Sequence, residues 1–253
     1  MNISDRTVFI AGGTSGIGRE MARSFAASGS TVAVGGRNSE ALAELAKEGF
    51  GAFSIDVTDD ASVAQARDAV LAQYPGLDTV VTMSGVMLLE DVRDPKHFGT
   101  ARTTIDTNLF GTIRVIDAFT PHLVGRGGGT FVTVSSGIAF LPFPPMPSYG
   151  ASKAAVHAYS EALRVQLDGT GVDVVELVPP AVATAAQKKL NPHALPLDDY
   201  VTEAMRLLSQ DPTPKEVLVE GVRMHRWAER DGTYDELVAQ RSKALTLLPG
   251  RQG

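Results

Sequence analysis

The residues of this chain most able to do chemistry are a tyrosine and a lysine four positions apart. Tyr149 and Lys153 stand in the segment SYGASK, and Ser136 lies thirteen positions before the tyrosine. On a helix, side chains at i and i+4 share a face, so the phenol and the ammonium would converge. A nearby cation favours the phenolate and brings the phenol's pKa, ordinarily about 10, closer to neutrality. Tyr149 would then exchange a proton with a substrate oxygen that Ser136 helps to hold.

A glycine-rich turn near the start of the chain offers a place for a nucleotide. Residues 12–18 read GGTSGIG and follow an apolar run that ends at Ile10. Gly12, Gly16 and Gly18 would let the backbone approach a diphosphate at the N-terminus of the next helix. A redox nucleotide bound there would indicate hydride transfer to or from a carbonyl beside the tyrosine. Taken alone, the turn also fits a plain strand-to-helix connection without a ligand.

The elements that must position these residues follow the pattern of βαβ units. Short β-branched runs alternate with longer Ala-rich amphipathic stretches, which predicts an α/β fold with a doubly wound parallel sheet of Rossmann type. We expect strands at 7–11, 31–35, 52–55, 79–82, 129–134 and 172–178, and helices near 16–28, 39–48, 60–73, 100–124 and 148–168. Ser148 is the expected N-cap of the helix that carries Tyr149 and Lys153.

The pattern changes after about residue 180. We expect a substrate loop and then a helical tail, with helices around 197–209, 214–230 and 232–246. Residues 216–220 resemble a strand, but Pro212 and Pro214 before them favour the start of a helix, so no seventh strand is expected. We treat residues 1–253 as a single domain of this fold.

Composition excludes several classes of protein. The chain has 253 residues, of which 43% are hydrophobic and 21% charged, as in ordinary soluble domains. A net charge of −6 gives nucleic acid no basic footprint. The N-terminus has no leader-like pattern, no apolar run is long enough to span a bilayer, and there are no cysteines, so we expect a cytoplasmic protein without disulfides. The histidines show no ligand spacing, and no metal is expected.

The end of the second expected strand bears on which nucleotide is bound. Arg37 stands where a carboxylate would read a ribose 2′-hydroxyl, and a cation there would bind a 2′-phosphate, which favours NADP(H) over NAD(H). A solvated arginine is the plainer alternative. Asp56, after the third strand, is a candidate acceptor for the adenine amino group, or else a cap for the next helix, a role that Thr58 and Asp59 could also fill.

Together with Asn108, a polar amide within an expected helix, these motifs resemble those of the short-chain dehydrogenase/reductase superfamily, in its compact single-domain branch. The resemblance covers residues 5–184 or so. It implies a nicotinamide cofactor and a catalytic tetrad of Asn108, Ser136, Tyr149 and Lys153, with the lysine also holding ribose hydroxyls. The cofactor would contact Gly12, Thr14, Ser15, Gly16, Ile17, Gly18, Arg37, Asp56, Val57, Ser84, Gly85, Asn108, Tyr149, Lys153, Pro179, Val182 and Thr184. Singly, Ser136 could be a cap and Asn108 a satisfied core amide.

Three segments depart from the pattern of that family. Its Asn-Asn-Ala-Gly stretch is here 82–85, TMSG, so hydrogen bonds that stiffen the sheet must be replaced. Its Pro-Gly after the sixth strand is Pro179-Pro180, which removes one N–H near the nicotinamide. Its C-terminal strand, which helps to form a tetramer, is not evident. We therefore expect a homodimer through the helices that hold Asn108 and Tyr149, with a tetramer as the alternative.

The substrate is the least constrained prediction. Apolar residues in loops near the expected site suggest a mostly apolar pocket and a small carbonyl or alcohol substrate; they are Met87, Leu88, Phe140, Leu141, Phe143, Met146 and Leu190. The leading hypothesis is an NADP(H)-dependent ketone or aldehyde reductase. A non-catalytic NADP(H)-binding regulator with the same fold is the alternative, and a nucleotide-sugar epimerase or dehydratase would need a larger C-terminal domain than about 70 residues supply.

Overall fold

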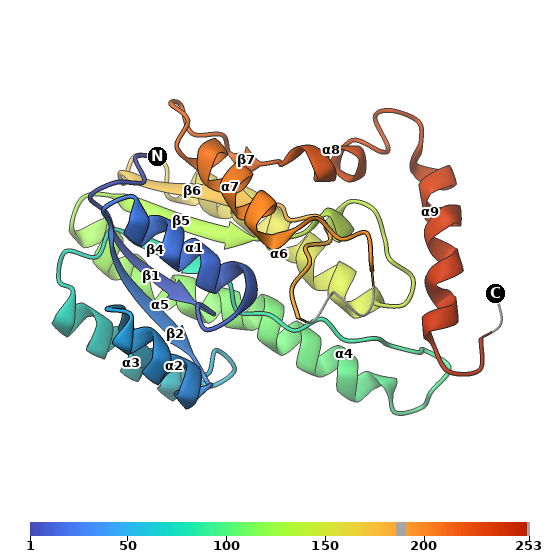
Figure 1. Cartoon of the computed structure of the whole chain (residues 1–253), viewed down its shortest axis with the longest axis horizontal. Coiled ribbons are helices and arrows are strands. Elements are labelled where there is room, and N and C mark those ends of the chain that lie inside the picture. Colours follow the sequence, from blue (N-terminus) through green and yellow to red (C-terminus); the bar gives the residue numbers. More distant parts are fainter. Residues whose placement is uncertain (186–190, 252–253) are drawn as a thin grey trace.

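The computed structural model describes residues 1–185 and 191–251, which form a seven-stranded parallel sheet with helices on both faces (Figure 1). The strand order is β3-β2-β1-β4-β5-β6-β7. Their bounds are β1 Thr7–Ala11, β2 Thr31–Gly36, β3 Gly51–Ser54, β4 Thr79–Thr82, β5 Gly129–Val134, β6 Val172–Leu177 and β7 Glu216–Val217. The order reverses between β1 and β4, and in such sheets ligands bind beyond the carboxyl ends of the strands at the reversal. The predicted doubly wound fold is confirmed.

Two hydrophobic cores hold the helices against the sheet. One core packs side chains of α1 (Gly16–Ala27), α2 (Ser39–Lys47) and α7 (Leu197–Leu208) against one face of the strands. The other packs α3 (Asp60–Gln73), α5 (Gly111–Gly125) and α6 (Pro147–Gln166) against the opposite face. Because both faces are covered, the central strands are apolar on both sides, as in β1, where Phe9 meets Phe119 of α5 with ring centroids 5.3 Å apart.

The long helix expected at 100–124 is interrupted by a π-helical turn. Helix α4 (His97–Ile105) passes through this turn at Asp106–Phe110 into α5. Asn108 lies inside the turn and is fully buried. Single π-turns re-aim the side chains they carry and recur at functional sites. The interruption therefore sets the direction in which the Asn108 amide points.

A seventh strand exists, and the prediction of a helix from residue 214 is wrong. Strand β7 pairs in parallel with β6: the N–H of Glu176 donates to the carbonyl of Lys215 at 2.9 Å, and that of Val178 to Val217 at 3.2 Å. Val217 and Val219 are buried while the residue between them is less so, which is the alternation of a strand. Helix α8 begins only at Glu220 and ends at Arg226.

The predicted N-cap of α6 is also wrong by two residues. The helix begins at Pro147, whose fixed φ suits a first helical position, and Met146 is the N-cap. Ser148 lies inside the first turn, where its backbone N–H donates to the Glu90 carboxylate at 3.3 Å. Tyr149 and Lys153 nevertheless stand on the same helix, as predicted.

The C-terminal tail reaches the carboxyl ends of the strands. Helix α9 (Tyr234–Ser242) stands beyond that end of the sheet and contributes no buried residue (Figure 1). It continues into a 3₁₀ turn at Lys243–Leu247. The tail is held to the body by side chains, among them Arg93, which donates to the carbonyl of Pro249 at 3.1 Å.

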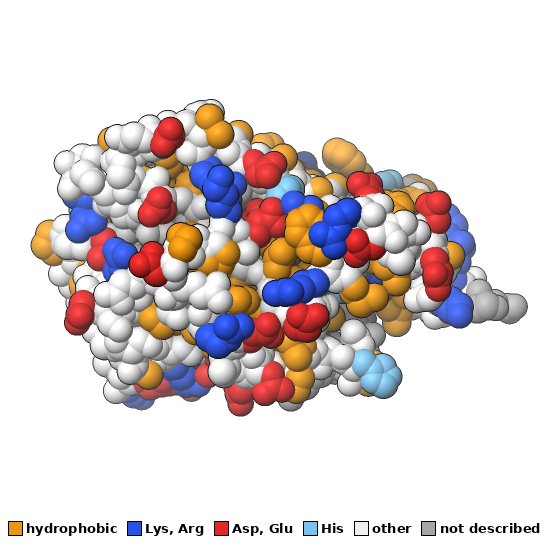
Figure 2. Space-filling model, turned by 90° about the horizontal axis from the view of Figure 1, so that it is seen from above, with side chains coloured by type: hydrophobic (Ala, Val, Ile, Leu, Met, Phe, Trp, Pro, Cys, Tyr) orange, Lys and Arg blue, Asp and Glu red, His pale blue; other side chains and the backbone are white. Residues whose placement is uncertain are grey.

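One face of the molecule carries mixed charge. On the face in Figure 2, lysine and arginine side chains alternate with aspartates and glutamates, and neither sign forms a continuous field. Among the described helices, none combines the length and the apolar character needed to cross a membrane.

Candidate active site

A cavity of about 900 Å³ runs along the carboxyl ends of the strands. At one end it is lined by the glycine turn, Arg37 and Asp56, and at the other by Tyr149, Lys153 and the C-terminal tail. The cavity therefore brings the predicted nucleotide-binding and proton-transfer residues into a single space, although they lie far apart in the sequence; the exception is Asn108, which is fully buried and does not line the cavity.

The glycine turn packs closely against neighbouring backbone, which leaves no room for side chains. A side chain at Gly12 would put its Cβ 2.4 Å from the backbone nitrogen of Ser84, and one at Gly18 would meet the carbonyl of Gly12 at 2.3 Å. Gly16 adopts a φ of +53°, which favours glycine, and lies against Thr184. Only the absence of these Cβ atoms lets α1 start so close to β4.

The N-terminus of α1 is left available to a ligand. Ser15 is its N-cap residue, but the Ser15 side chain makes no capping hydrogen bond. The first backbone N–H groups of a helix have no partner within the helix, so those of residues 16–18 point toward the cavity with the positive end of the helix dipole. Thr14 and Ile17 line the cavity beside them. The turn thus fits a diphosphate.

The residues beyond β2 and β3 form the outer end of the cavity. Arg37 is 65% exposed, and its guanidinium lies 3.8 Å from the Asp56 carboxylate, too far for a hydrogen bond. Asp56 accepts bonds from the backbone N–H and hydroxyl of Thr58 at 3.0 and 2.7 Å, which hold its pKa below the ordinary value, with a smaller contribution from Arg37. Asp59, not Asp56, caps α3. Val57 lines the cavity next to them.

The segment after β4 is held by Asn108. The Asn108 side chain accepts from the N–H of Val86 at 2.8 Å, and its amide group donates to the Val86 carbonyl at 2.9 Å and to the Ser152 hydroxyl at 3.1 Å. A Cβ at Gly85 would lie 3.3 Å from the Asn108 oxygen and 3.8 Å from Lys153 Nζ. The amide thus ties this segment to α6, whereas the Thr82 hydroxyl is buried without a partner among the described residues.

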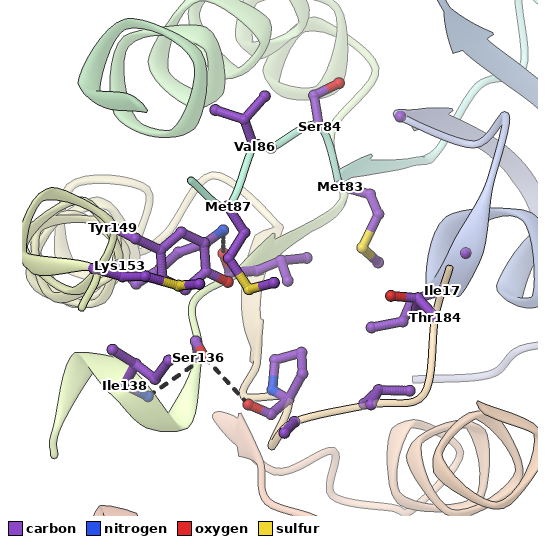
Figure 3. A pocket seen from close by; sticks show the side chains of 18 of the residues that line it. Ile17, Met83, Ser84, Val86, Met87, Ser136, Ile138, Tyr149, Lys153 and Thr184 are labelled. Atoms are coloured by element: carbon purple, nitrogen blue, oxygen red, sulfur yellow. Dashed lines mark hydrogen bonds between the residues drawn. The ribbon is translucent and has the colours of Figure 1, made fainter. Parts of the chain in front are cut away.

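Tyr149, Lys153 and Ser136 come together as the spacing predicts. The first two side chains project from α6 into the cavity, and Met87 reaches toward them from the segment after β4 (Figure 3). Lys153 Nζ lies 5.9 Å from the centroid of the Tyr149 ring and donates to the Val134 carbonyl at 2.8 Å. The Ser136 hydroxyl, at the end of β5, lies 3.4 Å from both the Pro179 carbonyl and the Ile138 N–H (Figure 3).

Burial dominates the electrostatics of this group. It raises the pKa of Tyr149, and a hydrogen bond with Ser136 offsets the rise in part. Burial lowers the pKa of Lys153 to about 8, although the buried Glu176 carboxylate acts in the opposite direction. The expected lowering of the Tyr149 pKa by Lys153 is therefore not what the structure displays, because removal from water outweighs the neighbouring cation.

Behind Lys153, one helical turn along α6, His157 pairs with Glu176. Their closest approach, from Nδ1 to a carboxylate oxygen, is 2.9 Å, and Glu176 is fully buried. The pairing raises the pKa of His157. Glu161 and Glu216 also place oxygens within 4.8 Å of this histidine, but Glu216 is held by two hydrogen bonds from Arg226 at 2.7 and 3.0 Å.

The segment after β6 closes the cavity. The Pro179 carbonyl accepts from the N–H of Gly137 at 2.9 Å, so it contributes an acceptor although the proline supplies no donor. Val182 is buried and pairs with Leu195, and Thr184 lies in the cavity beside Ile17 (Figure 3). The buried hydroxyl of Ser135 lines the same space and has no partner among the described residues. Hydrogen bonds within the chain therefore hold this end of the cavity in place, and the Ser135 hydroxyl remains available to a ligand.

Only some of the expected apolar residues line the substrate end. Met87, Phe143 and Met146 line the cavity, but Leu88 does not, and Phe140 and Leu141 turn inward, with Phe140 against His157 and Arg226. Leu190 lies outside the described residues. Two polar residues from the tail, His225 and Arg241, also line the cavity. No feature of the sequence indicated this role, because polar residues in a polar helix are ordinarily expected to face solvent.

Known proteins match this chain closely enough to place it. The family model described as short chain dehydrogenase matches residues 6–195. A protein named uncharacterized oxidoreductase DltE, from Bacillus subtilis, is 30% identical over 252 residues, which is 95% of this chain and 99% of the relative. The NADPH-dependent 1-acyldihydroxyacetone phosphate reductase of Schizosaccharomyces pombe is 30% identical over 93% of this chain and 79% of its own length.

Solved structures agree on the fold. A short-chain dehydrogenase from Burkholderia cenocepacia in complex with NADP superposes with a TM-score of 0.81 at 23% identity, covering 94% of this chain and 99% of that one. A short-chain type dehydrogenase/reductase from Mycobacterium ulcerans gives 0.77 at 28% identity, with 94% and 98% covered. With the family model and the Bacillus relative, these matches identify the chain as a short-chain dehydrogenase, a member of an oxidoreductase family that uses a nicotinamide cofactor.

Proposed function

We propose that the protein is an NADP(H)-dependent reductase of a ketone or aldehyde. The observation that carries this proposal is the convergence of Tyr149, Lys153 and Ser136 in the same cavity as the uncapped N-terminus of α1 and the exposed guanidinium of Arg37. A protein that only bound a nucleotide would need neither the serine nor the tyrosine at that place.

The cofactor would be held along the carboxyl ends of the strands and would supply the hydride. The N–H groups at residues 16–18 fit its diphosphate, and Arg37 fits a 2′-phosphate. Asp56 keeps one carboxylate oxygen away from Thr58 for the adenine amino group. Further contacts are proposed from other residues that border the cavity, namely Gly12, Thr14, Ser15, Val57, Ser84, Gly85, Pro179, Val182 and Thr184.

Two similar proteins support the preference for NADP(H). The Schizosaccharomyces pombe relative is an NADPH-dependent reductase, and the Burkholderia cenocepacia structure is a complex with NADP. Both agree with a cation, rather than a carboxylate, at position 37 of this chain.

Tyr149 would deliver the proton to the carbonyl oxygen as hydride arrives at carbon. Because burial raises its pKa, the phenol is protonated at neutral pH, which is the form that an acid catalyst of reduction requires. Ser136, which lines the same cavity as Tyr149, would donate to the same oxygen. The buried Lys153 ammonium stabilises the negative charge left on the phenol, and Asn108 positions α6 and the segment at Val86 around them.

We also propose that the protein is a cytoplasmic homodimer that pairs through α4, α5 and α6. Because strand β7 is present, the absence of a C-terminal strand no longer supports this pairing, and the support comes from the surface of these helices. Large apolar side chains on or between these helices are exposed: Phe98 by 69%, Phe110 by 49% and Val165 by 76%. Exposed apolar residues gathered on neighbouring helices are typical of contact surfaces. Light scattering of the purified protein would test the dimer, and a monomer at micromolar concentration would contradict it.

The reductase is tested by NADPH oxidation with a panel of ketones, aldehydes and quinones, with NADH in parallel. We expect turnover that prefers NADPH and that is lost in Tyr149→Phe. Tyr159→Phe is the matched control, because Tyr159 lies on the same helix but packs against the hydrophobic core rather than the cavity. Tight NADPH binding without turnover of any compound would instead favour the regulator.

A further inference from the structure

We propose that the carbonyl substrate carries an anionic oxygen group, which Arg241 binds with the help of His225. The inference rests on the proposed reductase function and specifies the substrate class of the same cavity. It assigns a binding role to two residues of the C-terminal tail that lie far from the catalytic residues in the sequence.

Arg241 is a partly buried cation without an acidic partner. The residue lines the cavity, and its side-chain hydrogen bonds within the described chain go from one nitrogen, Nη1, to the carbonyls of Leu141 and Pro142. Other arginines of the chain, such as Arg226, meet a carboxylate in two hydrogen bonds, whereas none of the described carboxylates lies within an ion-pair distance of Arg241. Burial without such a partner lowers its pKa to about 10.

A cation in this state is unfavourable unless something pairs with it. Removing a guanidinium from water costs free energy that an ion pair or several hydrogen bonds normally offset. Arg241 keeps donors other than Nη1 for a ligand, and the planar guanidinium matches carboxylate, sulfonate and phosphate oxygens in a bidentate manner. The arrangement is therefore that of a preformed site for an anion.

His225 supplies a second polar group on the same wall. Its Nδ1 is buried and has no hydrogen-bond partner among the described residues. The ring packs so closely against Gly137 that a Cβ added there would lie 2.7 Å from Nδ1. Gly137 directly follows Ser136 in the sequence. Burial lowers the pKa of His225 to about 4, with a further contribution from Arg241, so the imidazole is neutral near pH 7 and available as a hydrogen-bonding group.

The position of the two residues assigns the anion to the substrate. Arg37 and the N-terminus of α1, which fit the phosphates of the cofactor, lie at the glycine-turn side of the cavity. Arg241 and His225 lie on the tail side: Arg241 contacts the carbonyls of Leu141 and Pro142, just before Phe143, and His225 lies against Gly137. A substrate would therefore present its carbonyl to Tyr149 and Ser136 and its anionic group to Arg241. The apolar part between them would face Phe143 and Met146.

The competing explanation is that Arg241 only fastens α9 to the loop at Leu141. Two variants separate these roles. Arg241→Gln keeps a side-chain N–H donor for the Leu141 carbonyl but removes the charge, and Arg241→Lys keeps the charge but not the planar fork. Lys243→Gln is the matched control, because Lys243 is exposed two residues away, does not line the cavity, and its loss changes the net charge by the same amount.

The first measurement compares kcat/KM for 4-oxobutanoate and for its neutral methyl ester. We expect the wild-type protein to favour the anion, and Arg241→Gln to reduce the anion-to-ester ratio by roughly 10- to 100-fold, the range for a lost charge-assisted hydrogen bond. Arg241→Lys should recover part of the ratio, and Lys243→Gln should leave it within about 2-fold of wild type. A wild-type preference for the ester, or an unchanged ratio in Arg241→Gln, would overturn the inference.

A second measurement does not depend on turnover. The complex of the protein with NADP⁺ is titrated calorimetrically with propionate, propanesulfonate and propyl phosphate. The probe with the lowest Kd identifies the anionic group. We expect binding that weakens in Arg241→Gln and not in Lys243→Gln. Anion binding without reduction of any carbonyl would sustain this site and refute the reductase, whereas reduction of neutral carbonyls without anion binding by any of the three probes would sustain the reductase and refute the site.

Discussion

Replacing Arg37 with alanine should remove the preference for NADPH while leaving NADH binding almost unchanged. The guanidinium is 65% exposed and lies 3.8 Å from Asp56, so it has no hydrogen bond to that carboxylate to give up when a phosphate arrives. Because the two nicotinamide cofactors differ only at the 2′ position, the variant isolates the contact made there.

The size of the effect follows from this exposure. A hydrogen bond to a charged group contributes about 1.5–3 kcal/mol, and a site this open to solvent belongs at the lower end because water screens it. About 1.5 kcal/mol corresponds to a roughly tenfold increase in the Kd for NADPH. The Kd for NADH should change by less than about twofold, and the difference between the two cofactors should shrink as salt is added.

Fluorescence titration of each cofactor measures both constants directly. Arg67→Ala is the control, because Arg67 lies on α3 outside the cavity and carries the same charge. Equal weakening of NADPH and NADH in Arg37→Ala, or no change in either, would refute the assignment of Arg37 to the 2′-phosphate.

Three further predictions concern the parts of the chain that support the site. Burial lowers the pKa of Lys153 to about 8, so between that pH and 10.5 the unfolded chain binds more protons than the folded one. The free energy of unfolding should therefore rise with pH over this window, by roughly 3 kcal/mol more in wild type than in Lys153→Met. The same pH dependence of the free energy of unfolding in both proteins, measured by urea denaturation, would contradict this. Asn108→Ala leaves partly buried backbone groups of Val86 unpaired and should cost about 1–3 kcal/mol in urea unfolding. Phe119→Ala, at the centre of the core beneath β1, should cost about 3–5 kcal/mol, and a loss below about 1 kcal/mol would mean that the core repacks.

The fold was predictable because its signals are local and repeated. Each central strand is a short apolar run, and each following helix has its own periodicity, so the six-strand pattern and the i, i+4 relation of Tyr149 and Lys153 could be derived from the sequence. The failures lie where tertiary contacts decide. Residues 216–217 become a strand because the edge of β6 offers them backbone partners, against the helix start that the prolines before them favour.

In the site, too, local spacing was predictable and the effects of tertiary contacts were not. The spacing predicted which residues meet, but not that burial would raise the pKa of Tyr149 or that Asn108 would tie Val86 to α6. Those properties depend on the depth of the cavity and on a π-helical turn. Arg241 could not be predicted either, because its role follows from the place where the tail crosses the body of the protein.

The most direct test of the proposed function follows the hydride itself. The protein is incubated with a carbonyl compound and NADPH that carries deuterium at the transferable position of the nicotinamide ring, and the product is examined by mass spectrometry. We predict an alcohol with one deuterium bound to carbon, formed by wild type and by Tyr159→Phe but not by Tyr149→Phe. Deuterium transfer at the wild-type rate in Tyr149→Phe would contradict the role of that phenol as the acid.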